Sequence, residues 1–250
     1  MAEPDIYLSI IIPSYNEAEK LPKTLNRIQE YMENKPFTYE IIVAADGPRD
    51  NTIEIAKKMS SEIKNLRVID RRQNHGKGYT VREGMLAAKG KIRLFMDADN
   101  ATDVGHFDLM RPLFDKGYDI VISSRDPKDA DGAKQQVSQS FIKRLAGNMG
   151  NLYIQIMAVP GIWDTQNGFK AFRDHAAENI FKRTKIDKWT FDVEVLALAR
   201  NMHYKIGIVP ANWINDARSS VKISAYILSL LEVTKIRWNL FRGAYKTKEE

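Results

Sequence analysis

Hydrophobic and polar positions follow a repeating strand–helix rhythm along the first half of the chain. Short apolar, β-branched runs predict strands, and apolar positions three or four residues apart predict amphipathic helices. The predicted strands cover residues 8–12, 39–44, 66–70, 91–96 and 119–123, and the predicted helices cover residues 17–32, 50–63, 77–88 and 107–114. Such alternation with short connections indicates an α/β fold with a mainly parallel sheet flanked by helices.

After residue 125 this rhythm changes. Residues 127–138 are polar and predict a mobile loop. Residues 141–157 and 192–202 predict helices, and residues 204–210 predict a further strand.

The tail over residues 221–245 has the pattern of an amphipathic helix with basic flanks. Its apolar stripe consists of Ile223, Ile227, Leu230, Leu231, Thr234, Trp238 and Phe241. We expect the first half of this tail to pack on the domain. We expect its end, which carries Arg237, Trp238 and Arg242, to lie in a membrane interface.

Charge separates the two halves of the chain. The net charge is +6; residues 1–124 carry 18 basic and 19 acidic side chains, whereas residues 125–250 carry 20 and 13. A basic second half indicates an anionic partner, namely a phosphate, a membrane surface or nucleic acid, although an ordinary soluble face explains it equally well. Nucleic acid is the least supported of these partners, because few aromatic residues are interleaved with the basic ones.

We predict one domain over residues 1–220, divided at residue 124, and a basic tail over residues 221–250.

Composition also narrows the cellular context. The sequence contains no cysteine, which fits a reducing compartment. No apolar run approaches the ~20 residues needed to cross a bilayer. The first residues lack the charged and apolar segments of a signal peptide. We therefore expect a cytoplasmic protein that associates peripherally with the cytoplasmic face of a membrane.

Polar clusters follow the predicted strands of the first half, and each has two interpretations. Two carboxylates one residue apart, Asp97 and Asp99, could share a divalent cation or form an acidic turn. The other clusters could bind a ligand, or cap a helix and build a turn. Because carboxyl ends of parallel strands meet at one edge, the clusters should gather there. The gathered side chains are Tyr15, Glu17, Asp46, Lys77, Asp97 and Asp99, and they fit a nucleoside diphosphate with a divalent cation.

Four of these segments together resemble the inverting glycosyltransferases of family 2. They are 10–17 (IIIPSYNE), 40–47 (EIIVAADG), 76–78 (GKG) and 97–99 (DAD). The resemblance covers about residues 7–240 and implies the GT-A fold, a Rossmann-like sheet flanked by helices. Three later segments resemble the dolichyl-phosphate β-glucosyltransferases of this family, with dolichyl-phosphate mannose synthases as close cousins. They are 124–125 (SR), 164–170 (DTQNGFK) and 189–194 (WTFDVE).

The resemblance also implies roles for single residues. The nucleotide-sugar pocket would be lined by Pro13, Tyr15, Glu17, Val43, Asp97, Ala98 and Asp99, beside Asp46 and Lys77 from the edge cluster. Asp99, with Asp97, would bind Mg²⁺ or Mn²⁺, and Arg125 would meet a phosphate. The sequence departs from the family at Ala45, where an aspartate is usual. It also has Ala101 where mannose synthases carry a glutamine ligand to the metal, which weighs against a mannosyl donor.

The expected reaction is transfer of glucose from UDP-glucose to a dolichyl or other polyprenyl phosphate. Such an acceptor is already ionised and needs only cations to position it, for which Arg125, Arg218 and Lys222 are candidates. A hydroxyl acceptor would require a carboxylate base, for which Asp164 or Asp192 is the candidate. Turn building and helix capping are the alternative roles of these two aspartates.

Three alternatives stay open at this point. The first is a GDP-mannose-dependent transferase, and the second is a family 2 transferase with a glycan or another hydroxyl acceptor. The third is a non-catalytic, nucleotide-sugar-binding membrane subunit. In addition, the enzyme could work with a membrane-anchored partner subunit.

Overall fold

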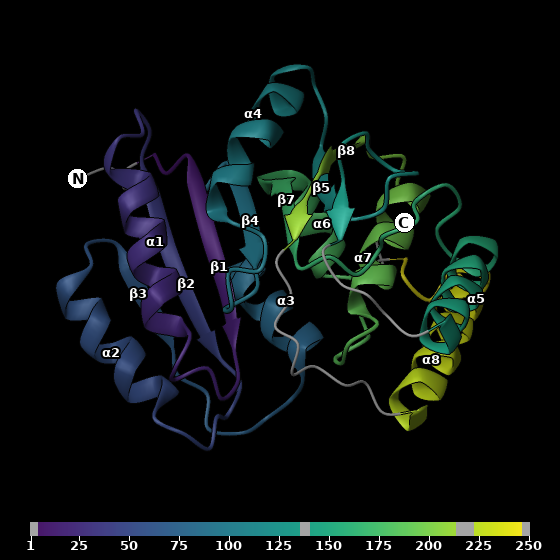
Figure 1. Cartoon of the computed structure of the whole chain (residues 1–250), viewed down its shortest axis with the longest axis horizontal. Coiled ribbons are helices and arrows are strands. Elements are labelled where there is room, and N and C mark those ends of the chain that lie inside the picture. Colours follow the sequence, from purple (N-terminus) through teal and green to yellow (C-terminus); the bar gives the residue numbers. More distant parts are fainter. Residues whose placement is uncertain (1–4, 136–140, 214–222, 247–250) are drawn as a thin grey trace.

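A mixed sheet of seven strands forms the centre of the computed structural model, which describes residues 5–135, 141–213 and 223–246 (Figure 1). The strand order is β3-β2-β1-β4-β7-β5-β8. The strands are β1 Leu8–Ser14, β2 Tyr39–Ala45, β3 Leu66–Ile69, β4 Ile92–Met96, β5 Ile120–Ser124, β7 Phe169–Arg173 and β8 Ile206–Pro210. β7 runs antiparallel to β4 and β5, and the other pairs of this sheet are parallel. The predicted α/β fold with a mainly parallel sheet is therefore confirmed.

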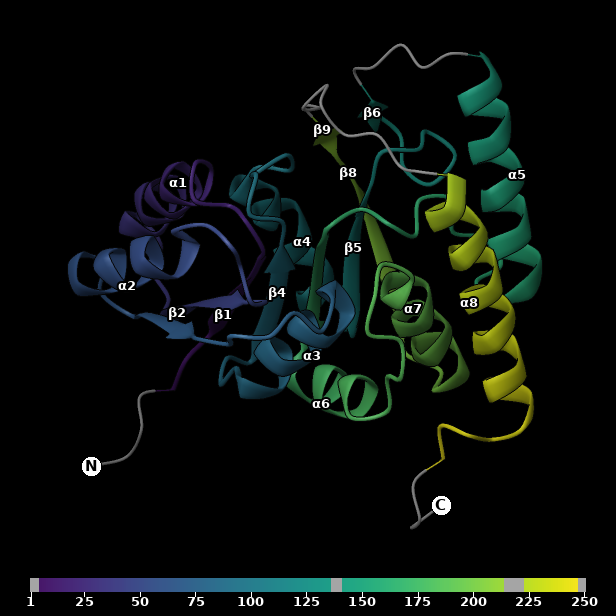
Figure 2. The same ribbon diagram turned by 90° about the horizontal axis from the view of Figure 1, so that it is seen from below.

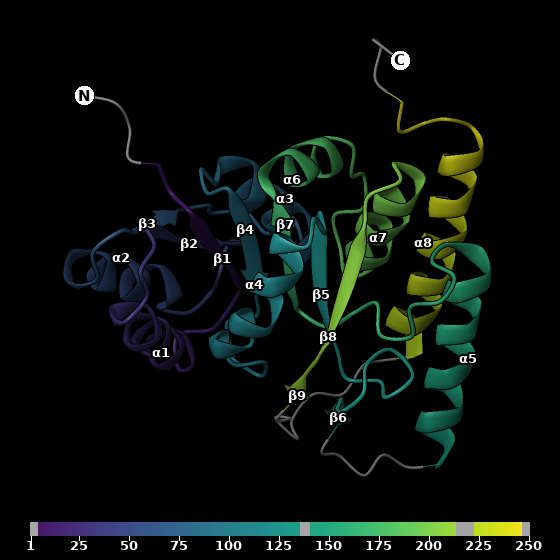
Figure 3. The ribbon, with the colours of Figure 1, turned by 90° about the horizontal axis from the view of Figure 1, so that it is seen from above.

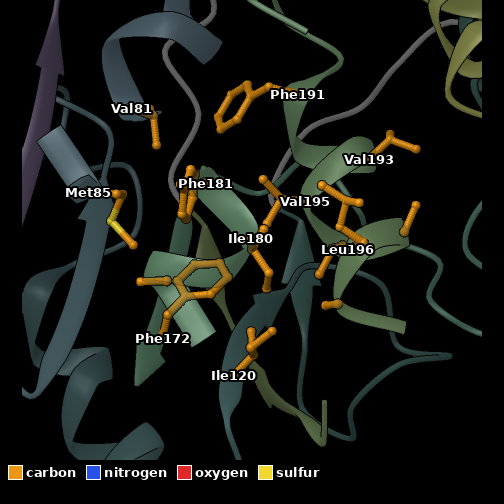
Figure 4. Close-up of a cluster of buried hydrophobic side chains, with 14 of the residues drawn as sticks. Val81, Met85, Ile120, Phe172, Ile180, Phe181, Phe191, Val193, Val195 and Leu196 are labelled. Atoms are coloured by element: carbon orange, nitrogen blue, oxygen red, sulfur yellow. The ribbon is translucent and has the colours of Figure 1, made fainter. Parts of the chain in front are cut away.

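Helices cover both faces of the sheet (Figure 2). One face carries α1 Leu21–Glu33, α2 Thr52–Glu62 and α4 Phe107–Asp115, and the other carries α3 Lys77–Ala87, α6 Asp174–Phe181 and α7 Phe191–Asn201. Successive residues of a strand point to opposite faces. In β1, Ile10 and Ile12 accordingly join the core under α1, whereas Ile11 joins the other core. Figure 4 shows the second core, where Phe172, Phe181 and other apolar side chains gather between the sheet and its helices.

Two long helices lie side by side next to α7 (Figures 2 and 3). They are α5 Phe141–Met157 and α8 Ile223–Phe241. A small parallel pair, β6 Lys134–Gln135 and β9 Asn212–Trp213, lies outside the main sheet. None of the helices that the structure describes combines the length and apolar character needed to cross a bilayer.

The predicted helical tail is confirmed in α8. The first half of the tail was expected to pack on the domain, yet Ile227 and Leu231 in that half are exposed. The buried side is formed instead by Val233 and Ile236. α8 is in contact with both α5 and α7, so these tertiary partners, and not the widest apolar stripe, determine which side is buried.

Element boundaries show where the sequence was less informative. The helix predicted from residue 17 begins at Leu21, because Pro22 suits only the first turn of a helix. Neither β7 nor α6 was predicted. The predicted boundary at residue 220, together with Arg218 and Lys222, lies outside the described residues.

Candidate active site

The carboxyl ends of β1, β2 and β4 meet at one edge of the sheet, because β1 is parallel to both neighbours. The chain continues from β1 to the strands on one side and later returns to β4 on the other. In open α/β sheets ligands bind at such a switch point. The loop after β1, which carries Tyr15 and Glu17, and the loop after β4, which carries Asp97 and Asp99, flank this point.

The carboxylates of the two loops are close enough to affect one another. Burial raises the pKa of Glu17, and Lys20 opposes this shift. The charges of Asp99 and Asp97 raise this pKa further. This mutual repulsion is a reason for a cation to bind between the loops.

Asp97 is held in place from two sides. Lys77 Nζ lies 2.5 Å from Asp97 Oδ1. The Asp97 backbone N–H donates to the Gly168 carbonyl at 3.1 Å. A Cβ at Gly168 would overlap the Asp97 carboxylate, so any other residue at this position would force that carboxylate to shift. The segment 164–170 therefore sets the position of a carboxylate that follows β4.

Lys77 stands at the first position of α3 with its ammonium directed to the same edge. Burial opposes its charge, but Asp97, Asp192 and Asp99 raise the pKa of Lys77. The ammonium also lies 5.4 Å from the ring centroid of Trp189. Lys77 thus stays protonated among carboxylates and beside an exposed indole.

Asp46 is almost fully buried and its carboxylate is fully engaged within the protein. It accepts hydrogen bonds from the backbone N–H groups of His75 at 2.8 Å and Gly76 at 2.9 Å. It also pairs with Arg71 at 3.0 Å. Asp46 therefore fixes the turn that precedes Lys77, and its predicted contact with a base stays a prediction.

The remaining predicted pocket residues differ in exposure. Tyr15 is 40% exposed, and Pro13 is half-buried in the last part of β1. Ala98 is buried, and its carbonyl accepts a hydrogen bond from Thr24 of α1 at 2.6 Å. Val43 is wholly buried in the core beneath α1 and α2, so its predicted contact with a nucleoside stays a prediction.

The second half of the chain adds two ion pairs. The Arg125 guanidinium binds Asp164 through two hydrogen bonds, each 2.7 Å long. Lys170 on β7 is wholly buried and lies 2.5 Å from Asp192, at the first turn of α7. Burial raises the pKa of Asp192, while the charges of Lys170 and Lys77 oppose that shift.

The two halves form one site. Although burial acts against it, the charges of Asp164, Asp97 and Asp192 raise the pKa of Arg125. Burial likewise opposes ionisation of Asp164, but Arg125 holds the pKa of that carboxyl below its usual value. Cations of the second half therefore face carboxylates of the first.

The acidic pair suits a metal ion only in part. Across the described ranges 5–135, 141–213 and 223–246, no three His, Asp or Glu side chains converge to hold a metal. Asp97 and Asp99 supply two carboxylates, so a cation there would need further oxygen ligands. Mg²⁺ commonly keeps several waters and takes oxygens from substrate phosphates.

Comparison with known proteins decides the family. Residues 9–181 match the family model described as glycosyl transferase family 2. The chain belongs to glycosyltransferase family 2. It is therefore a glycosyltransferase, as the resemblance implied.

Relatives of this family 2 glycosyltransferase share most of its length. It is 35% identical over 260 residues to the dolichyl-phosphate beta-glucosyltransferase of Dictyostelium discoideum, covering 98% of this chain and 78% of the relative. It is 33% identical over 244 residues to dolichyl-phosphate beta-glucosyltransferase ALG5D of Trichomonas vaginalis, covering 94% and 74%.

Solved structures share the fold at much lower identity. Mannosyl-3-phosphoglycerate synthase from Rubrobacter xylanophilus has a TM-score of 0.67 at 16% identity, covering 98% of this chain and 77% of that one. Glucosyl-3-phosphoglycerate synthase from Mycobacterium tuberculosis, in complex with Mn²⁺, uridine diphosphate and phosphoglyceric acid, has a TM-score of 0.63 at 16% identity, covering 92% and 78%. These likenesses confirm the expected GT-A fold of the family 2 glycosyltransferase.

Several residues at this edge were not predicted from the sequence of the family 2 glycosyltransferase. Gly168 and Lys170 lie in segment 164–170, where only Asp164 had been given a role. Asp129, in the polar loop after β5, accepts hydrogen bonds from the backbone N–H groups of Trp163 and Asp164 at 2.8 Å. A lysine inside an apolar strand was the available signal for Lys170, because an unpaired lysine is almost never fully buried.

Proposed function

We propose that the protein transfers glucose from UDP-glucose to a polyprenyl phosphate such as dolichyl phosphate. This proposal rests on the ion pairs that the two candidate base carboxylates, Asp164 and Asp192, form with cations of the protein. Asp164 is bound to Arg125 and Asp192 to Lys170, so both candidate base carboxylates already have a cationic partner. A hydroxyl acceptor would have to give up its proton, whereas a phosphate acceptor is already ionised near neutral pH.

The names of the relatives support the same acceptor. The Dictyostelium and Trichomonas proteins are named dolichyl-phosphate beta-glucosyltransferases, and each aligns with more than nine-tenths of this chain. Arg125 is the described cation of the second half that we assign to the acceptor phosphate. The contributions of Arg218 and Lys222 stay predictions.

The donor would bind between the loops after β1 and β4. Asp99, with Asp97, would hold Mg²⁺ or Mn²⁺, and the ion would complete its ligands with diphosphate and water oxygens. Such an ion neutralises negative charge on a departing diphosphate. Lys77, which lies 2.5 Å from Asp97, adds a fixed positive charge at the same place.

An exposed apolar surface on α5 and α8 supports attachment to a membrane. Most of the exposed large apolar side chains of the described chain lie on these two neighbouring helices. They are Met149, Leu152 and Ile156 of α5 and Ile227, Leu228, Leu231, Trp238 and Phe241 of α8. Lys235, Arg237 and Arg242 are exposed near them and would suit anionic lipid. We propose peripheral attachment to a cytoplasmic membrane face through this two-helix surface.

A transfer assay with paired donors and acceptors tests the proposal. UDP-glucose and GDP-mannose are each offered with a short polyprenyl phosphate or a soluble hydroxylated acceptor, in the presence of Mn²⁺. We expect glucose on the polyprenyl phosphate, and no such product from Asp99→Ala. Transfer to the hydroxylated acceptor that disappears in Asp192→Asn would contradict the proposal, and mannose as the preferred sugar would correct the donor.

A further inference from the structure

Glu194 is a fully buried carboxylate in the first turn of α7 that holds three separate segments together. It accepts the Lys185 N–H at 2.9 and 3.0 Å and the Ile186 N–H at 2.9 Å. It also accepts the Tyr245 hydroxyl at 2.7 Å, from the segment that follows α8. Burying a carboxylate is costly unless its oxygens are bonded, so these donors explain how it is tolerated. Capping of α7 alone does not account for them.

The loop that Glu194 holds packs directly against the start of α3. A Cβ at Gly78 would lie 2.5 Å from the Ile186 carbonyl oxygen, so the two backbones touch. The Tyr79 N–H donates to the Asp187 carbonyl at 3.1 Å, and Arg82 binds the Asp187 carboxylate at 2.7 Å. Any shift of the loop therefore moves the first turn of α3.

This first turn carries Lys77 of the proposed donor site, and this loop carries Trp189 beside it. Lys77 projects from α3 to Asp97, and Trp189 is the exposed indole of the loop beside the Lys77 ammonium. The carboxylate that orders the loop thus determines where these two side chains stand. Within the described residues, the side-chain hydrogen bonds of Glu194 go to Lys185, Ile186 and Tyr245 and do not reach Lys77 or Trp189.

We propose that Glu194 is a positioning residue of the donor site, and that Tyr245 makes the segment after α8 a structural part of that site. The chain of contacts runs from Tyr245 through Glu194 and loop 184–190 to Lys77. These contacts connect α8, the helix that we assign to the membrane surface, with Lys77 of the proposed nucleotide-sugar site. The expected kinetic effect rests on the proposed function, whereas the structural link does not.

The test compares Tyr245→Phe with Tyr204→Phe, a half-buried tyrosine whose hydroxyl binds Asn179 away from the site at 2.9 Å. In Tyr245→Phe we expect faster hydrogen–deuterium exchange over residues 184–190 and 76–80. We also expect about a fivefold higher KM for the nucleotide sugar, the size that one lost hydrogen bond predicts. The KM for the polyprenyl phosphate and the kcat should change less than about twofold, and Tyr204→Phe should change neither KM.

Variants of Glu194 separate positioning from general stability. Glu194→Gln keeps a carbonyl oxygen that can accept both loop N–H groups, so this variant should retain its affinity for the nucleotide sugar. Glu194→Met keeps the length of the side chain but has no such acceptor, so it should lose that affinity. Unchanged exchange over residues 184–190 in Tyr245→Phe would overturn the structural link. Faster exchange with an unchanged donor KM, or a rise confined to the lipid acceptor, would overturn the positioning role. Absence of glucose transfer by the wild type would instead refute the proposed function.

Discussion

The contact between Gly168 and Asp97 shows how strongly one residue can constrain the site. The Asp97 carboxylate occupies the space that a Cβ at Gly168 would need, so a methyl group there must displace it. Gly168→Ala should lower transfer at least about tenfold, because small misplacements of reacting groups are costly. The measurement is kcat/KM for the donor at saturating polyprenyl phosphate.

Gly147→Ala provides the matched control for this change. Nothing lies within 4 Å of a Cβ at Gly147, which is an exposed position of α5. Alanine there should preserve activity and favour the helix by about 0.5–1 kcal/mol. Wild-type activity in Gly168→Ala would show that Asp97 can move without loss.

The ion pair of Asp164 with Arg125 predicts a pH dependence of stability. The folded pKa of Asp164 lies below its unfolded value, so its stabilising contribution is complete above about pH 4 and is lost as pH falls through the folded pKa. Asp164→Asn should lower the free energy of unfolding by about 1.5–3 kcal/mol at pH 7. Urea unfolding should show this difference shrinking below about pH 4.

An exposed carboxylate of the polar loop after β5 tests whether the effect is specific. Asp131→Asn removes the same charge at an exposed position, and its stability should follow that of the wild type at every pH. A difference between wild type and Asp164→Asn that stays constant down to pH 3 would argue against the ion pair as its cause.

At the residue scale, the sequence predicted which side chains belong to the site better than it predicted which residues contact them. Asp97, Asp99 and Lys77 were predicted because carboxylates and glycines after strands are local signals. The contact of Gly168 with Asp97 was missed, because it depends on β7 entering the sheet beside β4. No pattern within a few residues of Asp97 contains this information.

At the element scale, the exposed surface on α5 and α8 predicts how the protein meets lipid. Leu231→Gln combined with Phe241→Gln leaves the charge unchanged and removes apolar area that would enter the bilayer. Binding to anionic vesicles should weaken at least about tenfold, since two large apolar side chains contribute more than 1.4 kcal/mol when buried. Co-sedimentation over a range of lipid concentrations measures the change.

Leu109→Gln is the matched control for the membrane surface. Leu109 is 50% exposed on α4, apart from the two-helix surface, so its replacement should not affect vesicle binding. Equal binding by all variants would remove the apolar surface as the attachment site. Deletion of everything after Val233 would be less informative, because it also removes the buried Ile236 and Tyr245.

At the scale of the whole molecule, donor binding should stabilise the fold. A ligand at a concentration 100 times its Kd adds about 2.7 kcal/mol, which corresponds to about 5–10 °C in Tm for a chain of this size. We expect this shift with UDP-glucose and Mn²⁺ together, a smaller one when EDTA is present, and none in Asp99→Ala. Differential scanning fluorimetry measures it, and an equal shift with EDTA would contradict a metal-assisted site.

The first half of the molecule was more predictable than the second. Strands β1 to β4 and their helices follow a regular βα rhythm, so hydrophobic spacing predicts both the elements and the edge where they end. The second half breaks this rhythm with an antiparallel strand, with α8, which packs on α7, and with α5, which packs on α8. Periodicity describes one element at a time and does not specify such packing.

The place of β7 in the sheet has a consequence for folding during synthesis. β7 lies between β4 and β5 in the sheet, so these two strands cannot be joined into one sheet until the chain has been made as far as Arg173. At about 5–20 residues per second, β4 remains an open edge strand for several seconds after it leaves the ribosome. An open edge is a template for pairing with other chains. The nascent chain is therefore most prone to aggregate after β4 is made and before β7 arrives.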